Sequence, residues 1–131
     1  MSSLTLCVKK IKASGAEFLA EDEAAIREML GYALVREGFQ FEEAADVEQA
    51  RPLMAKVMLA TRAEDGCIEY NYAEDVLDPG LIRISEVWES RAQLGAHLKT
   101  PHMAVWGEER TALGLSGRAI TVFEADAGTA L

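Results

Sequence analysis

The chain has 131 residues, half of them hydrophobic, and this length fits one domain with a core of its own. Acidic residues outnumber basic ones by 22 to 13, which gives a formal net charge of −9. Such a surface repels phosphate backbones and anionic lipid headgroups, so neither nucleic acid nor a membrane is an expected partner. The two cysteines, Cys7 and Cys67, are too few for a disulfide framework and lack the CxxC spacing of a zinc or redox site. A reduced, cytoplasmic protein is therefore expected.

The first part of the chain carries two overlapping patterns. A helix from about Glu21 is indicated by apolar residues that recur at helical spacing, namely Ile26, Met29, Leu30, Ala33 and Leu34. A strand is indicated by apolar residues at alternate positions, which would share one face: Ala33, Val35, Phe39 and Phe41. Periodicity alone does not separate a helix continuation from a strand there. We assign a helix up to about Leu30 and a strand from about Ala33 to Glu42, because the later elements lack one partner strand.

The next element is a predicted helix that ends at Gly66. Asp46 can cap it and Gln49 can complete a capping box, while Gly66 provides the stop. Pro52 lies past the first turn and should kink the helix or delay its start.

A β-hairpin follows. Residues 67–75 alternate between apolar and polar positions, and residues 81–88 do the same. Pro79 suits the first central position of a turn, and Gly80 can adopt the positive φ required at the second.

Two short helices and a last strand complete the pattern. Ser90 is a candidate N-cap with Gln93 three residues later, and Pro101 suits the first turn of a second helix that runs to about Leu113. The sequence GLSG should break that helix, and residues 118–126 alternate as a strand. We predict an N-terminal extension with an amphipathic helix at residues 1–31, one domain at residues 32–126 and a tail at residues 127–131.

The predicted order from Ala33 onward is strand, helix, strand, strand, helix, strand, which is the α+β, ferredoxin-like βαββαβ arrangement. The sequences TRAEDGCIEYNYAED, EVWESRAQLGAHLKTPHM and GRAITVFEA resemble the antibiotic biosynthesis monooxygenase family over roughly residues 33–125. That resemblance implies a dimeric α+β barrel, in which the sheets of two copies pack face to face. A homodimer is therefore expected.

A second, weaker resemblance covers residues 20–50, which are similar to the start of a response-regulator receiver domain. Glu21 and Asp22 would match the acidic metal-binding pair of that family. No apolar strand ending in a phosphoacceptor Asp follows at the required distance, because the sequence there is MLATRAEDGC. A working receiver is therefore not expected.

The candidate site lies in the stretch that holds both histidines and both tryptophans. His97 and His102 are five residues apart, about 140° around a continuous helix, and Pro101 interrupts that helix. No cysteine or acidic cluster completes a recognisable ligand spacing, so no metal site is expected. As purely structural residues, His97 would be a partly buried helix histidine bonded to a strand, and His102 would be exposed.

A functional interpretation competes with this one. It places His97 and His102 along a pocket between the second helix and the sheet, with aromatic walls formed by Tyr70, Tyr72, Trp88 and Trp106. Such walls suit a flat aromatic ligand because offset stacking supplies both contact area and orientation.

The family resemblance implies oxidation of quinol-type or polyketide-type aromatics without metal or flavin. A base then deprotonates a phenol so that the anion reacts with O2, and His97 is our candidate for that catalytic base. Tyr72 or Trp106 could stabilise the developing oxyanion. Haem-degrading relatives carry a histidine ligand near the position of Gly107, and glycine cannot bind iron.

Glu86 and Cys67 are the two remaining candidate side chains, and both are expected to have structural roles. Glu86 would be a solvated carboxylate paired with Arg83 or Lys99, and Cys67 a small hydrophobic residue. The alternative to a monooxygenase is a non-catalytic dimeric barrel that binds a small ligand, because the fold does not fix one function.

Overall fold

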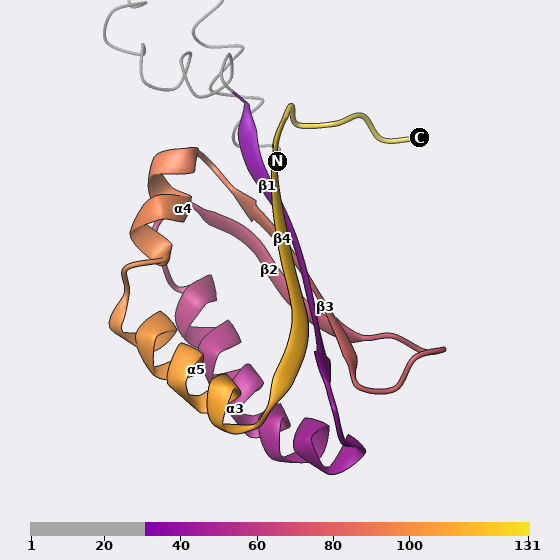
Figure 1. Cartoon of the computed structure of the whole chain (residues 1–131). Helices are drawn as coiled ribbons and strands as arrows, with labels where there is room; N and C mark the ends of the chain where they lie inside the picture. The colour runs from indigo at the N-terminus through magenta and orange to yellow at the C-terminus, as the bar shows by residue number, and fades with distance from the viewer. Residues whose placement is uncertain (1–30) are drawn as a thin grey trace, which may run out of the picture.

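A computed structural model describes residues 31–131, which form one antiparallel four-stranded sheet with helices on one of its faces (Figure 1). The strand order is β2-β3-β1-β4. The elements in chain order are β1 (Tyr32–Phe41), α3 (Ala44–Arg62), β2 (Cys67–Glu74), β3 (Leu81–Trp88), α4 (Arg91–His97), α5 (Pro101–Ala112) and β4 (Leu115–Ala125). This is the predicted ferredoxin-like α+β fold. The predicted N-terminal helix lies outside the described residues.

The ambiguous segment after residue 31 is a strand. β1 pairs antiparallel with both β3 and β4, so it lies inside the sheet. This confirms the assignment that we made because the later elements lacked one partner strand. Ala33, Val35 and Phe39 are buried on the face that the helices cover. The same segment carries part of the receiver-like sequence, but its antiparallel pairing differs from a receiver's parallel sheet. Glu21 and Asp22 lie outside the described residues.

The start of α3 differs from the prediction. The helix begins at Ala44 with Glu43 as its N-cap, and Asp46 lies in the first turn, where a carboxylate favours the helix dipole. No side-chain cap forms, so the predicted capping box is wrong. Pro52 lies inside the helix and does not delay its start, because the backbone is already helical at Ala44.

Local turn chemistry predicted the next elements well. Leu81 donates its N–H to the carbonyl of Asp78, and Gly80 has φ 93°, as the Pro79–Gly80 turn requires. Ser90 accepts a hydrogen bond from the backbone N–H of Gln93 and caps α4. α5 begins with Pro101 at its first turn. The hairpin and the helix pair are therefore confirmed.

The last strand is longer than predicted. Gly114 has φ 74° and ends α5, but β4 begins directly after it at Leu115. Gly117, which we interpreted as part of a break, has φ 63° and lies where the register with β1 shifts. A glycine at positive φ is typical of a β-bulge, so this residue bends the strand without interrupting it.

The core between the sheet and the helices contains two apolar clusters. One includes Phe39, Met54 and Trp106, and the other includes Val35, Trp88 and Leu94. Buried polar side chains occur on the same face of the sheet: Glu37 lies between Val35 and Phe39 in β1, and Glu86 lies between Ile84 and Trp88 in β3. Polar groups at such positions are costly, so they point to a role beyond packing.

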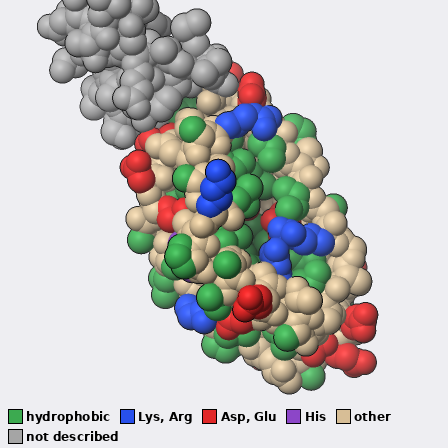
Figure 2. Space-filling model, turned by 60° about the vertical axis from the view of Figure 1, so that its left-hand side comes forward, with side chains coloured by type: hydrophobic (Ala, Val, Ile, Leu, Met, Phe, Trp, Pro, Cys, Tyr) green, Lys and Arg blue, Asp and Glu red, His purple; other side chains and the backbone are tan. Residues whose placement is uncertain are grey.

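The helices do not cover the sheet completely. Ile120 of β4 pairs with Glu37 and therefore shares the helix-covered face of β1, yet Ile120 is 45% exposed. Figure 2 shows hydrophobic side chains in a band on one side of the molecule, between basic side chains. None of the described helices is long and apolar enough to cross a membrane.

Candidate functional site

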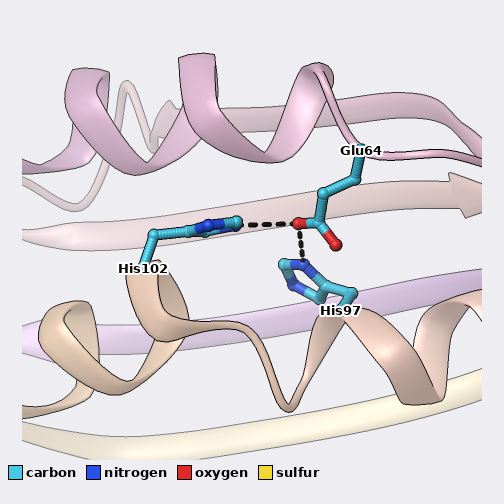
Figure 3. A group of neighbouring side chains, drawn as sticks. All are labelled: Glu64, His97 and His102. Carbon is cyan, nitrogen blue, oxygen red and sulfur yellow. Dashed lines mark hydrogen bonds and ion pairs between the residues drawn. The ribbon is translucent and has the colours of Figure 1, made fainter.

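Three side chains meet beside the junction of α4 and α5 (Figure 3). The Oε2 atom of Glu64 lies 2.7 Å from Nδ1 of His97 and 2.8 Å from Nε2 of His102. Glu64 follows α3, His97 ends α4 and His102 begins α5. One carboxylate oxygen therefore binds both histidines.

This convergence corrects the prediction that the two histidines diverge. The 140° separation assumes one continuous helix, whereas α4 ends at His97 and α5 begins at Pro101. The intervening residues redirect the chain, and Thr100 donates its hydroxyl hydrogen to the carbonyl of His97. His102 is partly buried, with 27% of its side chain exposed, so the expectation of a fully exposed residue is also wrong.

The sheet register explains why Glu64 reaches this junction. Cys67 at the start of β2 pairs with Trp88 at the end of β3, so the turn after α3 lies beside the start of α4. Gly66 completes that turn at φ 82°, and its carbonyl accepts the N–H of Glu89. Positive φ suits glycine, which lets the chain turn into β2 directly after Glu64.

His97 is buried between aromatic rings, with 1% of its surface exposed. Its ring lies over Trp88 with centroids 4.8 Å apart, and Tyr70 approaches it edge-on at 5.3 Å. Burial lowers the pKa of His97, while the hydrogen bond to Glu64 acts in the opposite direction. A neutral His97 that donates Nδ1–H to the Glu64 carboxylate leaves the lone pair on Nε2. That buried Nε2 atom has no hydrogen-bond partner among residues 31–131, which the structure describes.

The predicted aromatic residues form a connected series that starts at His97. Tyr70 contacts His97, Tyr72 lies 5.4 Å from Tyr70, and Trp106 lies 6.3 Å from Tyr72 between ring centroids. The two tyrosine hydroxyls share a hydrogen bond of 2.9 Å. Burial raises the pKa of both tyrosines, so both are neutral hydroxyls near pH 7. The indole N–H of Trp106 is buried, with no acceptor in the described part of the chain.

Glu86 is a buried carboxylate, contrary to the prediction that it is solvated. It is 4% exposed and accepts the indole N–H of Trp88 at 2.9 Å. Burial raises the pKa of Glu86 to about 7, although the Trp88 hydrogen bond favours the ionised form. Alternation along β3 put Glu86 on the face of Ile84 and Trp88, and this signal could have identified it.

A second set of charges is centred on the buried carboxylate of Glu37. Glu37 accepts the guanidinium of Arg118 at 3.2 Å, and Arg110 lies 3.7 Å from the same oxygen. The Arg110 guanidinium carbon is 6.0 Å from the ring centre of Trp106. Arg110 therefore places a positive charge beside Trp106, at one end of the aromatic series.

The aromatic residues differ in their access to surface pockets. Tyr72 lines one surface pocket together with Met54 and Ile82, and Tyr70 lines another together with Cys67. His97, Trp88 and Trp106 line neither of these two pockets. Cys67 is partly buried, and burial raises its pKa to about 11, which agrees with an unreactive thiol.

Comparisons with known proteins agree on one family. The family model described as "Antibiotic biosynthesis monooxygenase" matches residues 35–109. A candidate antibiotic biosynthesis monooxygenase from Deinococcus radiodurans has a similar structure, with a TM-score of 0.69 and 28% identity, covering 75% of this chain and 97% of that one. A conserved protein of unknown function from Bacteroides thetaiotaomicron gives a TM-score of 0.67 at 23% identity, covering 73% of this chain and 99% of that one.

A curated relative matches a shorter segment. An uncharacterized protein of Synechocystis is 40% identical over 42 residues, which is 32% of this chain and 29% of the relative. The match thus covers less than a third of that protein.

Glu64 is the residue of this site that sequence reasoning missed. It lies in a turn, where periodicity gives no information about side-chain direction, and its histidine partners are 33 and 38 residues away. The predicted topology did contain information about its position. The end of α3 leads directly into β2, and β2 lies beside the strand that leads into α4. An acidic residue just before Gly66 could have been placed near His97 on that basis.

Proposed function

The chain belongs to the antibiotic biosynthesis monooxygenase family, and we propose that it is a cofactor-independent monooxygenase-like protein for a small aromatic substrate of the quinol or polyketide type. The observation that supports this most is the state of His97. Glu64 binds its Nδ1, its Nε2 has no partner among the described residues, and aromatic rings border it on two sides. A base fixed in one orientation beside aromatic surface suits proton removal from a phenol.

The proposed first step is transfer of the phenolic proton to Nε2 of His97. The O–H bond breaks, its electron pair remains on the substrate, and the imidazolium that forms is stabilised by the Glu64 carboxylate at 2.7 Å. The resulting anion is electron-rich enough to react with O2. When the activated carbon carries two hydrogens, its oxidation to a carbonyl supplies the four electrons that reduce O2 to the inserted oxygen and one water. No external reductant is then required.

Donors for the developing negative charge are available along the aromatic series. We assign this role to the indole N–H of Trp106, for which the described residues provide no acceptor, and to the hydroxyl of Tyr72. Tyr70, Trp88 and His102 complete the proposed binding surface. The substrate enters from the side of β4, where Ile120 is exposed and the helices leave the sheet uncovered.

The test is O2 uptake by the purified full-length protein with a panel of quinols and hydroxylated polycyclic aromatics. We expect uptake with at least one compound, and a loss of about 100-fold or more in His97→Gln, which can donate to Glu64 but cannot act as a base. Glu69→Gln, at an exposed position of β2, is the matched control and should retain full uptake. Unchanged uptake in His97→Gln would refute the mechanism. Binding of these compounds without O2 uptake would favour the alternative, a non-catalytic barrel that binds a small ligand.

We further propose that two copies pair through the open face of the sheet. Val87 of β3, Leu34 of β1 and Phe123 of β4 are in register across three strands on the face opposite the helices. Phe123 is 46% exposed. A continuous apolar row on an uncovered sheet is typical of an interface.

We also propose that the protein works in the cytoplasm. The basis is its cysteine usage, since Cys67 is a free thiol and cysteine pairs with disulfide or metal spacing are missing from the sequence. Free thiols persist in a reducing compartment.

A further inference from the structure

We propose that Glu64, His97 and His102 form a binding site for a divalent transition metal ion of the Zn2+ type. The three donor atoms are Oε2 of Glu64, Nδ1 of His97 and Nε2 of His102, and all lie within 4.8 Å of one another. They come from the turn after α3, the end of α4 and the start of α5, so only the folded chain brings them together (Figure 3).

The donor types decide which ions fit. Two imidazole nitrogens and one carboxylate oxygen bind Zn2+, Co2+, Ni2+ or Fe2+, whereas Mg2+ and Ca2+ prefer oxygen ligands. An ion bonded at about 2.1 Å to each atom in tetrahedral geometry holds neighbouring donors roughly 3.4 Å apart. The observed N–O distances are 2.7 and 2.8 Å, so binding needs only small rotations of the side chains.

Burial of the three residues leaves one side open. His97 is closed off by Trp88 and Tyr70, whereas 15% of the Glu64 side chain and 27% of the His102 side chain are exposed. An ion can thus enter from the side of Glu64 and His102, and water can occupy its remaining positions. Three protein ligands plus water make up the usual open zinc site.

The hydrogen bonds within the cluster show which protons a metal must move. The Glu64 carboxylate accepts the Nδ1–H of His97 and, at 2.8 Å, the Nε2–H of His102. The hydroxyl hydrogen of Thr100 is donated to the carbonyl of His97, so the Thr100 oxygen can only accept in its 3.3 Å contact with Nε2 of His102. When the metal binds these two nitrogens, each neutral imidazole must carry its one ring proton on its other nitrogen. For His97 that nitrogen is Nε2, which is buried with no acceptor among the described residues. This cost predicts micromolar rather than nanomolar affinity.

The tautomer change links the ion to the proposed function. A proton on Nε2 occupies the lone pair that accepts the substrate proton, so the metal-bound protein should be inactive as a base. This inhibition rests on the proposed function, whereas metal binding rests only on the geometry of the three residues.

The experiment is calorimetric titration of tag-free, chelator-treated full-length protein with ZnCl2, together with Co2+ titration followed by visible absorption. The titrated protein carries both Cys7→Ser and Cys67→Ser, and this double variant is the background for all comparisons. Without thiols, metal binding by cysteine cannot contribute to the heat or to the absorption. We expect one ion per chain with a Kd in the micromolar range, Co2+ bands typical of nitrogen and oxygen ligands, and no heat with MgCl2.

Single-ligand variants decide between this site and other sites. Glu64→Gln and His102→Ala should each weaken Zn2+ binding by at least about tenfold, since loss of a ligand costs more than loss of an outer hydrogen bond. Glu69→Gln should bind as the background does, and circular dichroism checks that each variant is folded. Absence of stoichiometric binding, or an affinity in either ligand variant equal to that of the background protein, would overturn the proposal. Metal binding without O2 chemistry would leave the site in place and remove only the proposed function.

Discussion

Trp88 donates its indole N–H to the carboxylate of Glu86 across 2.9 Å, and both side chains are buried. This single hydrogen bond does not compensate for the burial of a charge, because burial raises the pKa of Glu86 from 4.5 to about 7. The folded protein therefore retains a proton on Glu86 at pH values where the unfolded chain has released it. Stability must then depend on pH in a defined direction.

We predict that the Glu86 contribution destabilises the protein as pH rises from about 4.5 to about 7. In this window the unfolded state binds fewer protons than the folded state, so the free energy of unfolding falls, and it levels off above pH 7. The total change is on the order of 3 kcal/mol at 1.4 kcal/mol per pKa unit. Glu86→Gln keeps an acceptor for Trp88 and removes this dependence.

The measurement is urea unfolding of the wild type and Glu86→Gln between pH 5 and 8. The difference between the two proteins isolates Glu86, because His97 and the other titrating groups are common to both. Glu69→Gln, which is exposed, should keep the wild-type slope. Parallel curves for the wild type and Glu86→Gln would contradict the prediction.

A second prediction concerns the pair that holds His97. Glu64→Ala should lower the free energy of unfolding by about 1–3 kcal/mol, because it leaves the buried Nδ1–H of His97 without an acceptor. Glu48→Ala removes an exposed carboxylate paired with Arg51 and should cost less than about 1 kcal/mol. Chemical denaturation of the two variants at pH 7 tests this. Equal losses would mean that the Glu64 contact contributes no more than a surface ion pair.

The turn at Gly66 provides a third prediction. Gly66 has φ 82°, and a Cβ atom there would collide with the side chain of Gln93. Gly66→Ala should therefore destabilise the protein by about 1–2 kcal/mol from the positive φ, because the flexible end of Gln93 can move away from the new Cβ atom. Gly95 in α4 has open space around it, and Gly95→Ala should be neutral or stabilising by up to about 1 kcal/mol. The comparison is made by thermal unfolding, and a Gly66→Ala protein as stable as Gly95→Ala would show that the turn relaxes freely.

The sequence was most informative where structure depends on neighbours in the chain. The Pro79–Gly80 turn, the Ser90 cap and Pro101 at the start of α5 each follow from the conformational preferences of one or two residues. The sequence of β1 fits the periodicity of a helix as well as that of a strand. It was assigned correctly only because the other predicted strands needed one more partner. Local propensity and the number of available partners together therefore fixed the fold.

The site was less predictable because its contacts are not local. His97 and the aromatic residues were identified from residue type, but Glu64 is 33 residues from His97 and joins it through the Cys67–Trp88 register. The angle between His97 and His102 was misjudged because Pro101 changes the chain direction. A proline shows that the two histidines do not lie on one continuous helix, but it does not show in which direction the second helix runs.

The last prediction concerns the open face of the sheet. Leu34, Val87 and Phe123 form an apolar row on that face, and Phe123 lies on the edge strand β4. If two copies pair through this row, Phe123→Asp places two unpaired carboxylates in the interface and should shift the protein from dimer to monomer. Ile120→Asp alters a residue of similar exposure on the helix-covered face and should leave the dimer intact. Light scattering after size-exclusion chromatography measures the mass of each variant. A dimer that survives Phe123→Asp but dissociates with Ile120→Asp would place the interface on the helical side, because the charge then disrupts contacts at that face.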